Sequence, residues 1–98
     1  PTRAWFEAAP AHERARVEEY VGHAIAPHEA PGVLLRLAMG SVAELAVAPV
    51  QDVLGLGAEA RMNTPSVAAG NWAWRMTPEQ MDPGLYAELA RLTRLFGR

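Results

Sequence analysis

The sequence predicts a mainly helical protein with one or two short strands. Apolar residues recur every three to four positions around residues 10–21, 31–39 and 85–96, which is the period of an amphipathic helix. Residues 44–50 form one short apolar stretch with the length and valine content of a strand. There is no internal repeat, and we therefore expect a single unit over residues 1–98.

Two amphipathic helices are expected in the first half of the chain. One begins at Pro10 and ends at Gly22, and the other opens at Pro31 and ends before Gly40. The second is more apolar, so we expect it to be more buried. The faces expected to be buried are Val17, Tyr20 and Val21 on the first helix and Leu34, Leu37 and Ala38 on the second.

The middle of the chain is predicted to contain a strand, a short helical turn and a loop in succession. Residues 44–50, ELAVAPV, are expected to be a strand, with Pro49 at the end of its ladder. Gln51 to Leu56 are predicted as a short helical turn with Asp52 near its start, and residues 57–71 as a loop. Long loops often carry function, so this loop is the first place to look for a site.

Two start signals precede the last predicted helix. Residues 77–80, Thr-Pro-Glu-Gln, match a capping box, and the Asp82-Pro83 pair repeats the signal. The apolar stripe that follows is Leu85, Leu89, Leu92 and Phe96.

Composition excludes several classes of partner and chemistry. Nine basic and eleven acidic residues give a net charge of −2 without a basic tract, which disfavours nucleic acid and anionic membranes as partners. The absence of Cys excludes disulfides, thiolate nucleophiles and thiolate metal sites. The chain has no apolar run of about 18 residues and no signal-peptide core, and we expect a soluble, cytoplasmic protein.

One run of residues is more specific than any helix or strand pattern. Residues 48–75, APVQDVLGLGAEARMNTPSVAAGNWAWR, resemble the C-terminal end of the 4-α-glucanotransferases, also called amylomaltases or disproportionating enzymes. In that family P-x-Q-D-x-L-x-L-G-x-E-A-R-M-N-x-P precedes G-N-W-x-W-R. Residues 2–6, TRAWF, resemble the T-R-x-W-W that follows the family's seventh strand, so the likeness covers nearly the whole chain.

The resemblance implies both a fold and a reaction. The chain would be the C-terminal fragment of a (β/α)8 barrel, with residues 45–50 as the eighth strand, since a complete barrel needs roughly 250 residues. The reaction would transfer α-1,4-glucan segments between maltooligosaccharides by a retaining mechanism, without a cofactor. The family's principal carboxylates lie upstream of the matching region, so we expect no catalytic residue here and no activity from these 98 residues alone.

The same resemblance places three loop residues beside the glucan-binding cleft: Asn63, Ser66 and Gly70. An Asn amide can bracket neighbouring sugar hydroxyls, but it can equally satisfy backbone groups of its own loop. Trp72 and Trp74 can stack on sugar rings or can pack to hold the loop in place. These alternatives stay open at the level of sequence.

The remaining polar candidates have structural interpretations. Asp52 and Asp82 are expected to be turn or cap carboxylates and not nucleophiles, and Glu59 a structural partner of Arg61. No metal site is expected, because three histidines are scattered without ligand spacing: His12, His23 and His28. Residues 55–57, Gly-Leu-Gly, lack the third glycine of a dinucleotide fingerprint, so nucleotide binding is rejected.

An alternative function comes from a different class of protein. Half of the residues are hydrophobic, so the chain could be a noncatalytic helical module whose apolar surfaces drive self-association or attachment to another chain. The partner would then be the rest of a barrel or a second copy. A free-standing carbohydrate-binding domain that uses Trp72 and Trp74 is a third reading.

Overall fold

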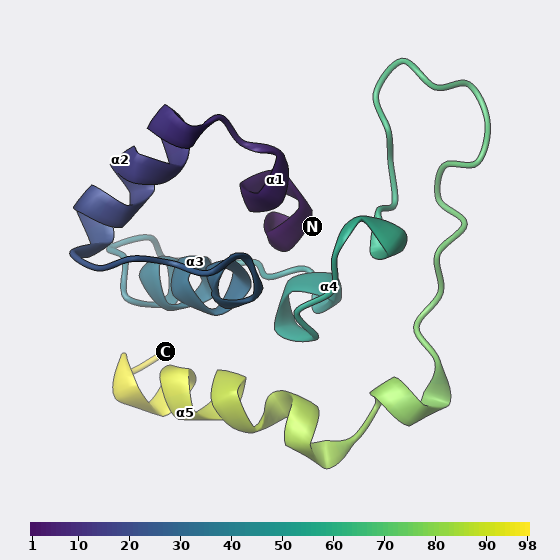
Figure 1. Ribbon diagram of the computed structural model, residues 1–98. Coiled ribbons are helices and arrows are strands. Elements are labelled where there is room, and N and C mark those ends of the chain that lie inside the picture. Colours follow the sequence, from purple (N-terminus) through teal and green to yellow (C-terminus); the bar gives the residue numbers. More distant parts are fainter.

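The structure, a computed structural model of residues 1–98, consists of helices joined by loops and contains no strand (Figure 1). None of the helices combines the length and the apolar character that crossing a bilayer requires. The α-helices are α1 (Thr2–Ala8), α2 (Ala11–Val21), α3 (Ala30–Met39), α4 (Val50–Val53) and α5 (Ala87–Leu95). Single 3₁₀ turns lie at Pro27–Glu29, Ala58–Ala60, Pro78–Gln80 and Pro83–Tyr86.

The first of two buried clusters holds α1 and α2 against α3. Phe6 of α1 is buried against Ile25 and Ala30. The partly buried residues around this cluster are Val17, Val21 and Val33. The sequence did not predict α1, because seven residues are too few to show a helical period or to be stable without tertiary packing.

Helix α2 has the predicted bounds, but not all of the residues predicted to be on its buried face are buried. Gly22 ends the helix in the left-handed conformation, at φ 93°, and its N–H donates to the Glu18 carbonyl at 2.8 Å. Val17 and Val21, one turn apart, pack toward Phe6. Tyr20 is 80% exposed, so its assignment to the buried face was wrong. Val17 and Val21, four positions apart, lie on the same side of the helix and reach the neighbouring cluster. Tyr20, next to Val21 in the sequence, does not reach it.

Helix α3 lies between the two clusters and is more buried than α2, as its apolar composition predicted. Its predicted face was wrong, since Leu37 and Ala38 are exposed and Leu34 is only half-buried. The buried residues are instead Ala30 at the start of the helix and, at spacings of i, i+4 and i+8, Pro31, Leu35 and Met39. Because α3 is apolar on several sides, periodicity alone could not specify which side meets α1 and α5.

Helix α5 supplies the centre of the second cluster, where Leu92 packs with Leu35 and Met39 and is 1% exposed. Both predicted start signals are present, although each opens a 3₁₀ turn. The Thr77 N–H donates to Gln80 Oε1 at 2.9 Å, and the Gly84 N–H donates to Asp82 Oδ1 at 2.7 Å. The capping interpretation of Asp82 is therefore confirmed.

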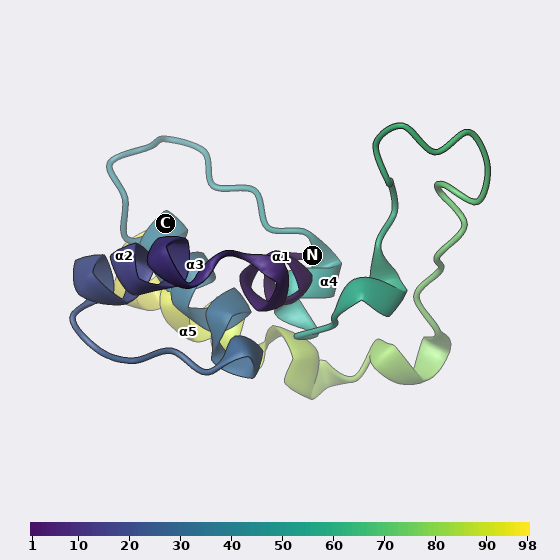
Figure 2. The same cartoon turned by 45° about the horizontal axis from the view of Figure 1, so that its top comes forward.

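The strand predicted at residues 44–50 was wrong. This segment runs from α3 to α4 without a backbone ladder, and Figure 2 shows it arching away from the helices. Leu45 and Val47 are 78% and 79% exposed, while Ala46 and Ala48 pack against the second cluster. A strand needs a partner strand to satisfy its N–H and C=O groups, and no other part of these 98 residues is extended beside it.

Candidate functional site

The candidate site lies where the start of α1, helix α4 and the beginning of the long loop meet. A hollow of about 280 Å³ opens there. Its lining residues come from all three segments: Pro1, Pro49, Gln51, Arg61, Met62 and Asn63. Of the predicted glucan-binding residues, only Asn63 lines this hollow.

Helix α4 forms at this junction because of the residues at its two ends. Pro49 precedes it in extended conformation, at φ −63° and ψ 142°, and its carbonyl accepts from the Asp52 N–H at 3.0 Å. Gly55 ends the turn at φ 71°, a conformation that glycine adopts without steric cost. The predicted helical turn with Asp52 near its start is thus confirmed.

Both carboxylate oxygens of Asp52 are bonded to Thr2. Oδ1 accepts the Thr2 N–H at 2.7 Å, and Oδ2 accepts the Thr2 hydroxyl at 2.6 Å. Asp52 is therefore a cap, as predicted, but it caps α1, fifty residues away in sequence, and not its own turn. Such bonds to an ionised acceptor are short and stronger than those between neutral groups.

Glu59 does not pair with Arg61, so that prediction was wrong. Its Oε1 accepts the Gly57 N–H at 2.9 Å. That bond, then a bond from the Glu59 N–H, and then the nearby charge of Arg3 lower the pKa of Glu59 below its ordinary value, against an opposing effect of burial. The Gly57 N–H is only two residues from Glu59, so the carboxylate can bond it within the same turn. This local bond forms instead of an ion pair with the flexible Arg61 side chain.

The long loop is closed at its base by its own backbone and by one side chain. The Trp72 N–H donates to the Met62 carbonyl. Asn71 bonds twice within the loop: Oδ1 accepts the Thr64 N–H, and Nδ2 donates to the Val67 carbonyl, each at 2.8 Å. Asn71 was not singled out from the sequence. Asn side chains often bond the backbone of their own loop, but this role was considered only for Asn63.

The predicted glucan-binding residues all lie on this loop and are exposed: Asn63, Ser66 and Gly70. Ser66 and Gly70 have positive φ, 66° and 85°, so the loop turns sharply at both points. Figures 1 and 2 show the loop projecting from the helices. Neither Ser66 nor Gly70 lines the hollow that Asn63 lines. The structure thus does not bring the three together around one cavity.

The two tryptophans differ in environment. Trp72 is exposed, at φ 62°, and Trp74 is half-buried. Arg75 Nη1 donates to the carbonyls of both, at 2.8 Å each, which fixes the backbone at the end of the loop. An exposed indole can stack on a sugar ring, so Trp72 is the better of the two candidates for that role.

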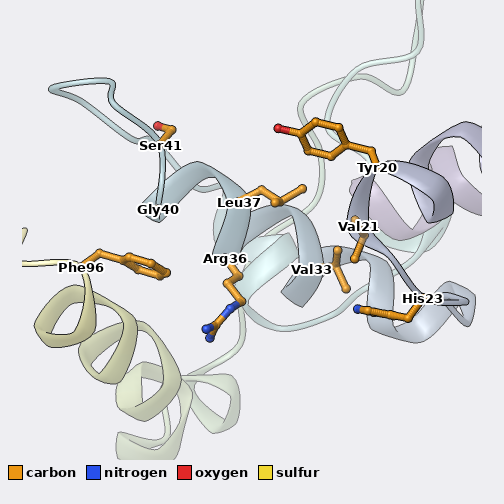
Figure 3. Close-up of a pocket in the computed structure, with 9 residues that line it drawn as sticks. All are labelled: Tyr20, Val21, His23, Val33, Arg36, Leu37, Gly40, Ser41 and Phe96. Atoms are coloured by element: carbon orange, nitrogen blue, oxygen red, sulfur yellow. The ribbon is translucent and has the colours of Figure 1, made fainter.

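The histidines stay dispersed and exposed, and no group of three or more His, Asp and Glu side chains could hold a metal ion. A larger hollow, of about 570 Å³, lies elsewhere, between α2, α3 and the end of α5 (Figure 3). The guanidinium of Arg36 lies 5.5 Å from the centre of the Phe96 ring there. None of the predicted site residues lines it.

Comparison with known proteins decides the family. The family profile described as 4-alpha-glucanotransferase, glycoside hydrolase family 77, matches residues 1–81. The chain belongs to the 4-α-glucanotransferase family. The 4-alpha-glucanotransferase of Synechocystis is 42% identical over 97 residues, covering 99% of this chain and 19% of that protein. The 4-alpha-glucanotransferase of Thermus thermophilus is 46% identical over 86 residues, covering 84% of this chain and 17% of that protein.

A solved structure extends the similarity to the backbone. The amylomaltase of Streptococcus agalactiae, in complex with acarbose, matches 99% of this chain and 19% of its own length, at 29% identity and a TM-score of 0.85. The chain thus spans about a fifth of the length of the relatives that it matches. The resemblance inferred from residues 2–6 and 48–75 is confirmed.

Proposed function

We propose that the protein carrying this chain transfers α-1,4-glucan segments between maltooligosaccharides by a retaining mechanism, without a cofactor. The observation that carries the proposal is the family match over residues 1–81. A relative of similar backbone is described in complex with acarbose, which supports a glucan-type ligand for the family. Retaining transfer uses one carboxylate as nucleophile and a second carboxyl group as acid and then base. We place both outside these 98 residues, which alone would be inactive.

The proposed fold of the whole catalytic unit is a (β/α)8 barrel, and residues 1–98 are its C-terminal part. The segment at residues 44–50 supports this, because its apolar residues Leu45 and Val47 are exposed in these 98 residues and would need a cover. In a barrel, this segment would become the eighth strand, paired on both edges and covered on both faces. The loop after it would then lie at the C-terminal face, where barrel active sites are built.

Within the chain, the proposed contacts to glucan come from the loop that follows α4. Asn63, Ser66 and Gly70 border the cleft, and Trp72 supplies an exposed ring for stacking. Asn71 serves the site indirectly, because its two bonds hold Thr64 and Val67 in place. We also propose that the protein is cytoplasmic.

Disproportionation of maltotriose by the full-length gene product tests the function. Glucose and longer maltooligosaccharides should appear without an added cofactor. In Asn63→Ala, the KM for maltotriose should rise about tenfold, the effect of losing one or two hydrogen bonds worth roughly 1.4 kcal/mol. The control is Glu19→Ala, an exposed residue of α2. Absence of any transfer product from the wild-type protein would reject the proposal.

A second candidate, self-association of these 98 residues, is favoured by one observation. Val42 is fully exposed, and Leu45 and Val47 are 78% and 79% exposed, in the one segment that joins α3 to α4. Apolar side chains exposed together in this way favour association with another chain. Sedimentation of the isolated chain should then show dimers or larger species, and Val47→Lys should return it to a monomer. A monomeric wild-type chain would reject this candidate.

A further inference from the structure

Two adjoining hollows meet at the junction of α1, α4 and the long loop. The first is the hollow that Asn63 lines. The second, of about 440 Å³, lies on the α1 side and includes Thr2, Trp5 and Asp52. Pro1 and Pro49 line both hollows. The shape of the Asn63 hollow therefore depends on how the start of α1 is held against α4.

Asp52 is the group that holds these two elements together. Its carboxylate spans the Thr2 N–H, at 2.7 Å, and the Thr2 hydroxyl, at 2.6 Å. Helix α1 has no side-chain cap from its own N-terminal residues, so this bond satisfies one of the N–H groups that a helix start leaves unpaired. Pro1, which directly precedes Thr2, lines both hollows, and the bonds to Thr2 thereby fix its position.

The neighbouring residue of α4 connects to the loop. Gln51 is buried, and its Nε2 lies 3.4 Å from the carbonyl oxygen of Ala60, at the limit of a hydrogen bond. Ala60 is fully buried and is followed directly by Arg61, Met62 and Asn63. Helix α4 thus contacts the start of α1 through Asp52 and the base of the loop through Gln51.

We infer that Asp52 is a positioning residue for glucan binding, which fixes the Pro1 wall of the hollow relative to Asn63. This inference rests on the proposed function, since it assumes that Asn63 contacts glucan. Substrate-binding groups must be held within about 0.5 Å of their working positions, and residues around them supply that precision. Asp52 does not line the Asn63 hollow itself, so its effect there passes through Thr2 and Pro1.

The test compares Asp52→Asn with Asp82→Asn in the full-length protein. These are the only two aspartates of the chain, and both cap a helical segment, but Asp82 bonds the Gly84 N–H and lines neither hollow. In Asp52→Asn, the KM for maltotriose should rise about tenfold with kcat changed less than about twofold, the pattern expected when binding is weakened equally in the ground state and the transition state. Asp82→Asn should leave both constants unchanged.

Changes at Thr2 keep the inference falsifiable if Asp52→Asn folds poorly. Thr2→Ser retains the hydroxyl bond and should behave as wild type, whereas Thr2→Val keeps only the N–H bond and should raise KM about threefold. Unchanged KM in both Asp52→Asn and Thr2→Val, or an equal rise in Asp82→Asn, would overturn the inference.

Hydrogen exchange separates this inference from the proposed function. In Asp52→Asn, amides at residues 2–4 and 61–63 should exchange at least about threefold faster than in wild type, while those of Asp82→Asn should not. If the wild-type protein transfers no glucan, the proposed function fails and faster exchange still establishes the coupling. Exchange that stays unchanged at residues 61–63 would show that Asp52 does not hold the loop base.

Discussion

The guanidinium of Arg98 caps the C-terminal end of α3, where its Nε donates to the main-chain oxygen of Met39 at 2.7 Å. Its Nη2 also donates to the Ala43 carbonyl at 2.7 Å and to the Ser41 carbonyl at 3.2 Å. The last carbonyls of a helix have no partner within the helix, and one arginine here satisfies them together with the loop that follows. Arg98 therefore joins α3 to the segment after α5.

Arg98→Lys should destabilise the protein by about 1–2 kcal/mol, because an ammonium group cannot reproduce the planar fork that reaches Met39 and Ala43 together. The urea dependence of unfolding, followed by circular dichroism, measures the change. Arg94→Lys is the matched control, since the Arg94 side chain is exposed on α5 and, unlike that of Arg98, bonds no main-chain carbonyl. Equal midpoints for the two variants would contradict the capping role of Arg98.

Leu92→Ala should cost about 2–5 kcal/mol of unfolding free energy, since the side chain is buried between Leu35 and Met39 and its removal leaves a cavity. Leu95→Ala, on the same helix, should cost far less because Leu95 is 54% exposed. Thermal unfolding of both variants provides the comparison. A Leu95 effect as large as that of Leu92 would show that α5 packs through a different face.

Gly32→Ala should raise stability by roughly 0.5–1 kcal/mol. Gly32 lies within α3, and a methyl group there would meet no atom within 4 Å, so alanine gains helix propensity without a clash. Gly22→Ala should lower stability by about 1 kcal/mol, because Gly22 ends α2 at φ 93°. The melting temperatures of the two variants should therefore shift in opposite directions. A shift in the same direction would mean that backbone conformation does not govern these positions.

Glu59 should make stability depend on pH. The Gly57 N–H bond lowers the pKa of Glu59 in the folded protein, so its contribution is present above the ordinary glutamate pKa of about 4.3. That contribution is lost as pH falls through the folded value. The stability difference between wild type and Glu59→Gln should thus be largest near neutral pH and vanish in acid. NMR titration of the Gly57 amide should show a midpoint below the ordinary glutamate pKa, and a stability difference that stays constant at every pH would refute the effect.

Local sequence determined several elements of this protein. Helix α2 and its end at Gly22, the start signals at Thr77 and Asp82, and the turn at α4 all depend on residues within one or two turns of one another. Interactions of this range can be read from spacing and residue type, because the backbone geometry of a helix brings positions i, i+3 and i+4 together. The family was also recognisable, because the order of residues 48–75 is specific without any structure.

Tertiary structure alone decided the remainder. The buried side of α3 depends on where α1 and α5 approach, and residues 44–50 are not a strand because these 98 residues offer them no partner. Asp52 was correctly expected to be a cap, but its partner Thr2 is fifty residues away. Sequence spacing carries information over a few residues, whereas the choice of a distant partner depends on how the whole chain packs.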